Sequence, residues 1–233
     1  MTREDCLTDL LKLYDVVTVL SEKNGCKVLR LRNKASGRDL ILRSLPTQAE
    51  TYELLCNIRC ENLPETYDVF HTRDGQIVLE EYIDGITVAQ VMESGRYHYR
   101  GAKRVLQGLC AALQVLHDRG IIHRDIKPEN VMIDANGRVV LIDLNASHKE
   151  SDANRDTVIM GTVGYVAPEQ LGLSQSDART DVYAAGVLLN VMLTGSHPTK
   201  AFARGKAGRI VRKCTALNPD DRYQSADKLA TAL

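Results

Sequence analysis

Short runs of alternating apolar and polar residues fill the chain up to residue 83. They lie at 14–20, 26–32, 39–45, 67–71 and 76–82, with turn pairs at Asn24-Gly25, Ser36-Gly37 and Asp74-Gly75. Because side chains alternate between the two faces of a strand, this pattern predicts a five-stranded antiparallel sheet. A helical stripe over 47–58, made by Tyr52, Leu55 and Ile58, predicts one helix that covers a face of this sheet.

After residue 84 the apolar residues follow a helical period instead. Their spacing predicts one long helix that contains Ala102, Val105, Leu106, Leu109, Leu113 and Leu116 and ends near Gly120. A small hairpin is predicted from 131–133 and 139–142, and a helix surrounded by protein from 182–193, with Gly195 as its stop. The fold class is therefore α+β, with an N-terminal lobe over 1–83 and a mainly helical C-terminal lobe over 84–233.

Composition narrows the classes of partner. The 233 residues contain 30 Lys and Arg and 30 Asp and Glu, so no global field favours nucleic acid or membrane surfaces. The six cysteines are scattered, which favours structural thiols in a reducing compartment. No apolar run reaches the length of a membrane span and the first residues do not resemble a signal peptide, so we expect a cytoplasmic protein without membrane contact by this segment. Oligomeric state, and whether a longer chain continues after Leu233, stay open.

The strongest chemical signal is HRDIKPEN at 123–130, followed by Asp143 in IDLN. Asp125 is the candidate catalytic base that takes a proton from an attacking hydroxyl, and Lys127 is placed to reach a transferring phosphate. Asn130 and Asp143 offer the hard oxygen ligands that magnesium accepts. The plain alternative, a hydrophilic loop in which Asp and Asn only form turns, leaves the eight-residue string and the downstream Asp unexplained.

These motifs, with GTVGYVAPE at 161–169 and NPDDRYQSA near the C-terminus, resemble the catalytic domain of eukaryotic-type (Hanks-type) protein kinases. Lys127 with Pro128 resembles the Ser/Thr branch. The resemblance spans Tyr14 to about Leu229. It implies a bilobal kinase fold, ATP with Mg²⁺ (or Mn²⁺) as cofactors, and a protein substrate with Ser or Thr hydroxyls.

The resemblance also assigns roles in the C-terminal lobe. Thr162 would contact the catalytic Asp and Lys, Asp181 would hold the backbone of the catalytic loop, and Glu169 would form a buried ion pair with Arg222. His123 would hold the loop in place and not shuttle protons. Arg124 would bind a phosphorylated activation segment, with Ser151 and Thr157 as candidate phosphosites, although a solvated polar loop is an equal alternative.

For ATP, the resemblance implies hinge backbone groups at Glu81 and Ile83 and apolar covers at Val28 and Met132. The full implied nucleotide set is Leu20, Val28, Ile41, Arg43, Glu81, Ile83, Met132 and Ile142. Glu80 falls at the gatekeeper position, and the sequence leaves open whether this carboxylate turns inward to a partner or outward to water.

Three features depart from the family pattern. The segment 20–28 lacks the glycines of a phosphate loop, Arg43 replaces a lysine, and Asp143-Leu144-Asn145 replaces D-F-G. Spacing places Thr51 where the carboxylate partner of Arg43 would lie, so the sequence leaves open whether Glu50, Glu53 or neither pairs with Arg43. The sequence therefore favours an active Ser/Thr protein kinase, with a pseudokinase that binds nucleotide or protein partners as the alternative. A small-molecule kinase is disfavoured by Lys127-Pro128 and the 161–169 segment.

Overall fold

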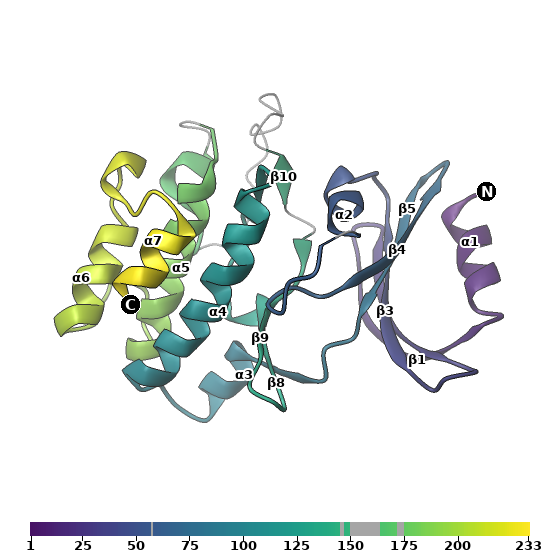
Figure 1. Ribbon diagram of the computed structural model, residues 1–233, viewed down its shortest axis with the longest axis horizontal. Coiled ribbons are helices and arrows are strands. Elements are labelled where there is room, and N and C mark those ends of the chain that lie inside the picture. Colours follow the sequence, from purple (N-terminus) through teal and green to yellow (C-terminus); the bar gives the residue numbers. More distant parts are fainter. Residues whose placement is uncertain (57, 145–146, 150–163, 172–174) are drawn as a thin grey trace. The chain divides into compact units, whose positions relative to one another are not determined.

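The computed structural model of this chain describes residues 1–56, 58–144, 147–149, 164–171 and 175–233. Two compact units make up the chain (Figure 1). Unit 1 contains Met1–Cys60 and Pro64–Ile83, and unit 2 contains Glu61–Leu63 and Asp84–Leu233. The short segment 61–63 joins unit 2 because Asn62 donates its side-chain amide to the Val139 carbonyl at 2.7 Å and accepts the Leu141 amide at 2.9 Å.

Unit 1 is built on the predicted five-stranded antiparallel sheet. Its strands are β1 (Tyr14–Lys23), β2 (Cys26–Asn33), β3 (Asp39–Leu45), β4 (Thr66–Thr72) and β5 (Gly75–Glu81), in the spatial order β1-β2-β3-β5-β4. The turn between β1 and β2 uses only Asn24 and Gly25, both at positive φ of 52° and 76°. Two residues at positive φ match the twist of a tight hairpin, which explains why the Asn-Gly pair predicts this turn.

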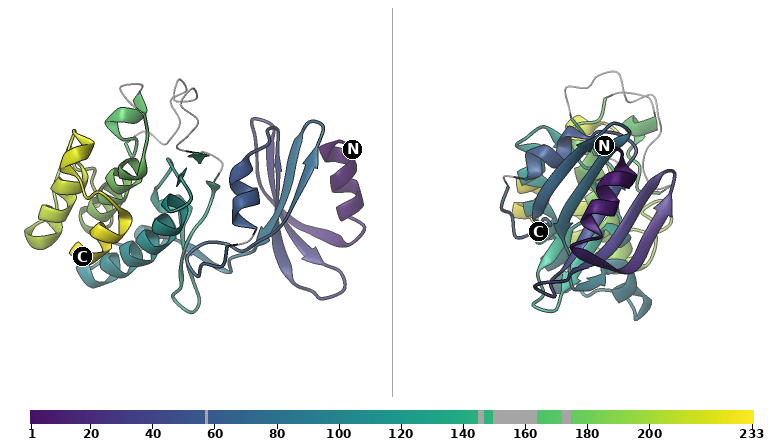
Figure 2. Two further views of the ribbon diagram at one scale, coloured as in Figure 1. Left: turned by 45° about the horizontal axis from the view of Figure 1, so that its top comes forward. Right: turned by 90° about the vertical axis from the view of Figure 1, so that its right-hand side faces the viewer.

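Two helices lie on opposite faces of this sheet (Figure 2). Helix α1 (Arg3–Leu10) covers one face, where Cys6 and Leu10 join a buried cluster. The sheet residues of this cluster are Leu29, Leu31, Leu40, Leu42, Ile77 and Leu79. Sequence periodicity did not predict α1, although Thr2 and Asp5 form a capping box at its start and give a local signal for it.

Helix α2 (Glu50–Leu55) on the other face is shorter than the predicted 47–58. The residues before it are held by the sheet instead. Gln48 donates to the Thr72 carbonyl, and the Ala49 amide donates to the Gln76 side chain at 3.0 Å. Since these groups already have partners on β4 and β5, the helix begins only at Glu50.

Unit 2 is mainly helical, as predicted. Its helices are α3 (Val88–Glu93), α4 (Tyr99–His117), α5 (Ala178–Thr194), α6 (Gly205–Cys214) and α7 (Ala226–Ala232). Its short strands are β6 (Gly85–Thr87), β7 (Ile121–Ile122), β8 (Val131–Asp134), β9 (Val139–Leu141) and β10 (His148–Lys149), and short 3₁₀ turns lie at Pro128–Asn130, Pro168–Leu171 and Pro219–Asp221. The β8–β9 hairpin and helix α4 confirm two predicted elements, whereas α3, β6 and the β7–β10 pair were not predicted.

Helix α5 forms the centre of unit 2, with α4, α6 and α7 packed against it (Figure 1). It starts four residues before the predicted position because Asp177 caps it through a capping box with Thr180, and it ends at Gly195 in the left-handed conformation. At Gly186 any side chain would collide with Cys214 of α6, so close packing of the two helices requires glycine there. Within the described ranges, no helix combines the length and the apolar character that a membrane crossing requires.

Candidate active site

The Asp125 carboxylate lies at the centre of a short hydrogen-bonded loop in unit 2. Lys127 Nζ donates to Asp125 Oδ2 at 2.6 Å, and Asn130 Nδ2 donates to the same oxygen at 3.0 Å. Asn130 Nδ2 also donates to the Asp125 carbonyl at 2.8 Å. Two donors on one carboxylate oxygen fix the direction in which Asp125 points, as a base that must meet a substrate hydroxyl requires.

Asp181 on α5 binds the backbone of this loop. Its Oδ2 accepts the His123 amide at 2.9 Å and lies 2.8 Å from His117 Nε2, while its Oδ1 accepts the Arg124 amide at 2.9 Å. Burial alone would raise the pKa of Asp181, but the hydrogen bond from His117 and the charges of His117 and His123 outweigh it, so the pKa lies below its ordinary value of 3.8. The buried carboxylate thus stays ionised and fixes two successive backbone amides.

Asp143 reaches the same loop through its neighbour Ile142. The Ile142 amide donates to the Asn130 carbonyl at 2.9 Å, and the Ile142 carbonyl lies 3.2 Å from His123 Nε2. Asp143 itself adopts a φ of 67°, a conformation that is uncommon outside glycine. Arg124 has a similar φ of 68°. The loop and the segment after β9 therefore bring Asp125, Asn130 and Asp143, three of the residues that the sequence nominated, into one region of unit 2, and each segment contains one of the two unusual backbone conformations.

These groups fit a magnesium ion. The side-chain nitrogen of Asn130 is used by Asp125, which leaves its oxygen as the atom for a cation, and Asp143 adds a carboxylate. Among the described residues, no group of three or more His, Cys, Asp or Glu side chains could hold a metal ion. Magnesium takes one or two protein ligands and fills the rest of its coordination shell with water and phosphate oxygens.

Glu169 and Arg222 form a buried ion pair within unit 2. Arg222 Nη1 and Nη2 donate to the two carboxylate oxygens at 2.6 and 2.8 Å, and both residues are at most 3% exposed. The remaining guanidinium donors bind the carbonyls of Ala216, Arg179 and Leu217. Every N–H of Arg222 therefore has a partner, which is the condition under which a buried pair is tolerated. Thr180 adds a hydrogen bond to Glu169 at 2.9 Å.

In unit 1, Arg43 pairs with Glu80. Arg43 Nε donates to Glu80 Oε1 at 2.6 Å, and each side chain is 7% exposed. The pairing follows from register: Arg43 lies opposite Val78 and Ile41 lies opposite Glu80, so Arg43 and Glu80 are diagonal neighbours on one face of β3 and β5. The sequence left open whether the Glu80 carboxylate turns inward to a partner or outward to water. In the structure it turns inward to Arg43.

The two carboxylates that the sequence offered for Arg43, Glu50 and Glu53, both lie on helix α2. Glu53 lies 3.2 Å from His71 Nε2, with both side chains about half exposed. Glu50 is exposed, whereas Thr51 between them is buried at 4%. Of the two carboxylates considered for Arg43, Glu53 thus contacts His71, and the neighbouring strand supplies Glu80 as a carboxylate close to Arg43.

The remaining nucleotide candidates lie on separate parts of the two units. In unit 1, Ile41 and Ile83 are buried, Val28 and Glu81 are partly buried, and Leu20 on β1 is 52% exposed. In unit 2, Met132 on β8 and Ile142 are partly buried. Thr162, Ser151 and Thr157 lie outside the described residues.

The β1–β2 hairpin differs from a phosphate-binding loop in its pairing. Strand pairing continues to the turn, with Glu22 opposite Lys27 and Lys23 opposite Cys26. Lys27 Nζ lies 3.4 Å from Glu22 Oε1. Between Ser21 and Val28 the ladder leaves only the two turn residues outside it, so this end of the hairpin offers few backbone amides to a phosphate.

Comparison with known proteins identifies the family of this chain. A model described as "Protein kinase domain" matches residues 18–230. The chain belongs to this family. The match covers β1 to α7 and includes the catalytic loop, the Asp143 segment and the Glu169–Arg222 pair.

Bacterial and plant kinases are among the relatives. "Serine/threonine-protein kinase PknB" of Mycolicibacterium smegmatis is 31% identical over 184 aligned positions, which cover 67% of this chain and 29% of that protein. "Probable serine/threonine-protein kinase SCO3848" of Streptomyces coelicolor is 29% identical over 261 positions, covering 93% of this chain and 38% of that protein. "CBL-interacting serine/threonine-protein kinase 19" of Arabidopsis thaliana is 28% identical, with 81% and 42% covered. The chain thus spans less than half the length of these kinases.

Sequence reasoning missed one residue of this site, His117. His117 is the last residue of α4, and its side chain contacts Asp181, the carboxylate that binds the catalytic loop. Its side chain is only 5% exposed at the end of an apolar helix face, and a histidine in such a position is the signal that could have found it.

Proposed function

We propose that this kinase domain transfers the γ-phosphoryl group of ATP to Ser or Thr hydroxyls of a protein. The observation that carries the proposal is the fixed Asp125 carboxylate, which is bound by Lys127 and Asn130 in the loop that Asp181 holds. Phosphoryl transfer needs positioning and charge stabilisation more than covalent chemistry, and this loop is built for positioning.

Each residue has a distinct part in the proposed reaction. Asp125 orients the substrate hydroxyl and accepts its proton as the oxygen attacks phosphorus. Lys127, whose ammonium lies beside this carboxylate, stabilises the negative charge of the phosphoryl oxygens. Asn130 and Asp143 would hold the magnesium ion, which when bound neutralises phosphate charge and aligns the transferring group. The Asp181 network keeps the loop in the geometry that these steps require.

Transfer of labelled phosphate tests this proposal. The purified chain is incubated with magnesium, γ-labelled ATP and a generic basic protein, beside Asp125→Asn and a matched control, Asp118→Asn. Asp118 is an exposed carboxylate of the same unit that accepts only from Gln114 among the described residues. Loss of a general base costs about 10²- to 10⁴-fold in rate, so the first variant should lose labelling and the second should not. Equal labelling by Asp125→Asn and the parent would refute the assignment.

A second function, a pseudokinase that works by binding, is favoured by two observations in unit 1. Arg43 is a buried arginine held by Glu80, where the family pattern has lysine, and the β1–β2 hairpin is paired up to its turn. Arginine presents a wide planar fork where lysine presents a compact charge, so the exchange changes the geometry of any phosphate contact. A pseudokinase would transfer no labelled phosphate to protein in this assay.

A thermal-shift measurement with ATP and magnesium then resolves the outcomes. A ligand that binds only the folded state stabilises it by about 2.7 kcal/mol at a hundredfold excess over Kd. A shift without labelling supports a nucleotide-binding pseudokinase, whereas neither shift nor labelling supports one that ignores ATP. Arg43→Lys should label at least as fast as the parent, and a large loss would mean that the site depends on the guanidinium.

A further inference from the structure

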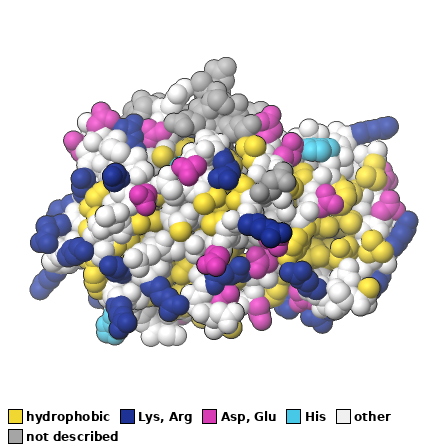
Figure 3. Space-filling view, in the orientation of Figure 1, with side chains coloured by type: hydrophobic (Ala, Val, Ile, Leu, Met, Phe, Trp, Pro, Cys, Tyr) yellow, Lys and Arg dark blue, Asp and Glu magenta, His cyan; other side chains and the backbone are white. Residues whose placement is uncertain are grey.

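Two segments of unit 2 concentrate the positive charge of this otherwise neutral chain. Residues 94–117 and 182–219 contain ten Lys and Arg and no Asp or Glu. The rest of the chain is left with twenty Lys and Arg against thirty Asp and Glu. Figure 3 shows Lys and Arg side chains gathered over α6 and the first turns of α4. A separation of charge on this scale creates a local positive field even though the net charge is zero.

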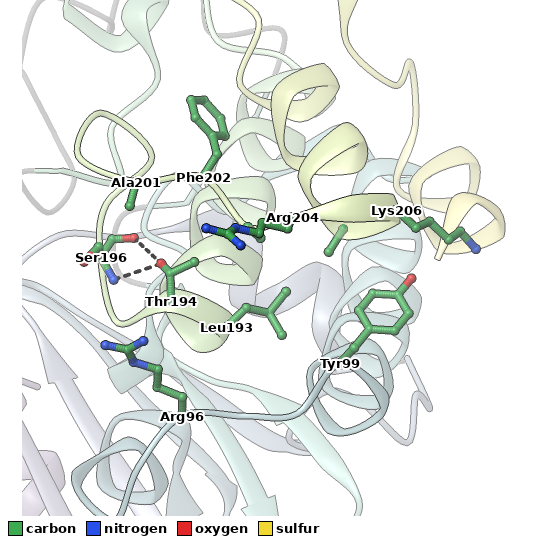
Figure 4. A pocket seen from close by; sticks show the side chains of 11 residues that line it. Arg96, Tyr99, Leu193, Thr194, Ser196, Ala201, Phe202, Arg204 and Lys206 are labelled. Carbon is green, nitrogen blue, oxygen red and sulfur yellow. Dashed lines mark hydrogen bonds between the residues drawn. The ribbon is translucent and has the colours of Figure 1, made fainter.

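The two segments meet at an open groove (Figure 4). It has a volume of about 700 Å³ and lies between the start of α4, the end of α5 and the start of α6. Its cations are Arg96, Arg204 and Lys206. Tyr99, Leu193, Phe202 and Ala207 provide apolar surface between them. Figure 4 shows that Arg96 and Arg204, which both line the groove, extend from different segments.

A second groove shares Arg96 with the first. It has a volume of about 710 Å³ and adds Arg100 and Arg104 along α4. The Tyr97 hydroxyl, which belongs to a lining residue of this groove, is buried and has no hydrogen-bond partner in the described part of the chain. No acidic residue lines either groove. The two grooves together form a surface with five cations, which we call the basic groove.

The cations of the basic groove are available to a ligand. The side chains of Arg96, Arg100 and Arg204 are exposed and form no hydrogen bond or ion pair with another described residue. Arg104 and Lys206 donate only to the carbonyls of Gly137 and Leu233. Surface arginines that lack acidic neighbours within their own fold leave their charge to be matched by a partner.

The surroundings of the cations favour a polypeptide as that partner. Apolar side chains line the groove together with the cations, which suits a polypeptide that carries carboxylates beside an apolar side chain. An RNA strand would need aromatic rings for stacking. One face of the exposed Phe202 ring is already covered by the Arg212 guanidinium at 5.0 Å, and Tyr99 is partly buried with its hydroxyl bound to the Leu233 carbonyl. A flat lipid surface would not fill a concave groove with an apolar floor.

We propose that the basic groove is a docking site for an acidic, extended segment of a protein partner. Carboxylates of the segment pair with Arg96, Arg100 and Arg204, and an apolar side chain fills the space beside Leu193 and Phe202. This surface uses none of the residues assigned to phosphoryl transfer. Docking here therefore recruits a partner independently of the chemistry.

Fluorescence anisotropy without nucleotide tests the proposal separately from kinase activity. The probe is a short labelled peptide in which Glu pairs alternate with Leu, compared with the same peptide carrying Gln for Glu. The protein variants are Arg96→Glu, Arg204→Glu and, as a matched control, Arg119→Glu. Arg119 is an exposed arginine just beyond the other end of α4, whose 19 residues span about 28 Å at 1.5 Å of rise per residue.

We expect saturable binding of the Glu peptide and none of the Gln peptide. Because each reversal replaces an attraction by a repulsion, Arg96→Glu and Arg204→Glu should each weaken binding about fivefold to tenfold, while Arg119→Glu leaves it unchanged. Equal weakening by all three variants would mean nonspecific attraction and would overturn the proposal. Tighter binding of a uridine oligonucleotide or of phosphatidylserine vesicles than of the Glu peptide would overturn it as well.

Discussion

Removing the charge of Glu80 should destabilise unit 1 far more than an ordinary surface change. In Glu80→Gln the side chain keeps its size, but the Arg43 guanidinium, which is 7% exposed, loses the negative charge of the Glu80 carboxylate. Two unit charges roughly 4 Å apart interact by about 4 kcal/mol at an effective dielectric constant of 20. Breaking one partner of a buried pair costs about 3–5 kcal/mol, which agrees with this value. For a chain of this size, that corresponds to a fall in Tm of about 6–20 °C.

Urea unfolding followed by circular dichroism measures this cost, and the same sheet provides a matched control. Glu22 pairs with Lys27 at 3.4 Å, but these side chains are 63% and 35% exposed, so Glu22→Gln should cost less than about 1 kcal/mol. The double variant Arg43→Met/Glu80→Leu removes both charges and should return to within about 1 kcal/mol of the parent or exceed it.

The single variants Arg43→Met and Glu80→Leu, together with this double variant, form a cycle that isolates the pairing. If Glu80→Gln costs no more than Glu22→Gln, the Arg43–Glu80 pair is not a buried one in energetic terms. Pairing with Glu80 of β5 would then not be what stabilises the buried Arg43 of β3. A double variant that is less stable than both single variants would refute it too, because it would show that the charges are not mutually dependent.

Three further predictions concern other parts of the molecule. Arg222→Lys keeps the charge but loses the fork that binds Glu169, so it should cost about 3–5 kcal/mol in urea unfolding; an unchanged midpoint would contradict this. The hydrogen bond from Arg32 holds the pKa of Asp39 at about 2, against an ordinary value of 3.8, so its stabilising effect is complete above the ordinary value and disappears as the pH falls through about 2. The stability difference between the parent and Asp39→Asn should shrink over that range, and a constant difference would show that pairing does not depend on the charge. Gly186→Ala should lower stability by about 1–3 kcal/mol by forcing α5 and α6 apart, and a thermal scan that matches the parent would disprove that contact.

Local pattern was sufficient to predict much of the fold. The Asn24-Gly25 turn, the five alternating strands and the long helix α4 each depend on interactions between residues close in sequence, so periodicity and turn chemistry predict them. Helix α1 was missed because it is eight residues long and its signal is a capping box, not a long apolar stripe. Helix α2 was predicted too long because its expected first turn is bound by β4 and β5, and such a contact is invisible to local reasoning.

By itself the sequence determined which chemistry to look for, since HRDIKPEN and the later Asp143 carry it in their order and residue types. Which side chains distant in the sequence come into contact depends on the tertiary structure. Arg43 and Glu80 are 37 residues apart and become partners through the diagonal register of β3 and β5. His117 reaches Asp181 across 64 residues, and the basic groove joins two acid-free segments from different helices. Packing and strand register set these contacts, and neither leaves a periodic signal along the chain.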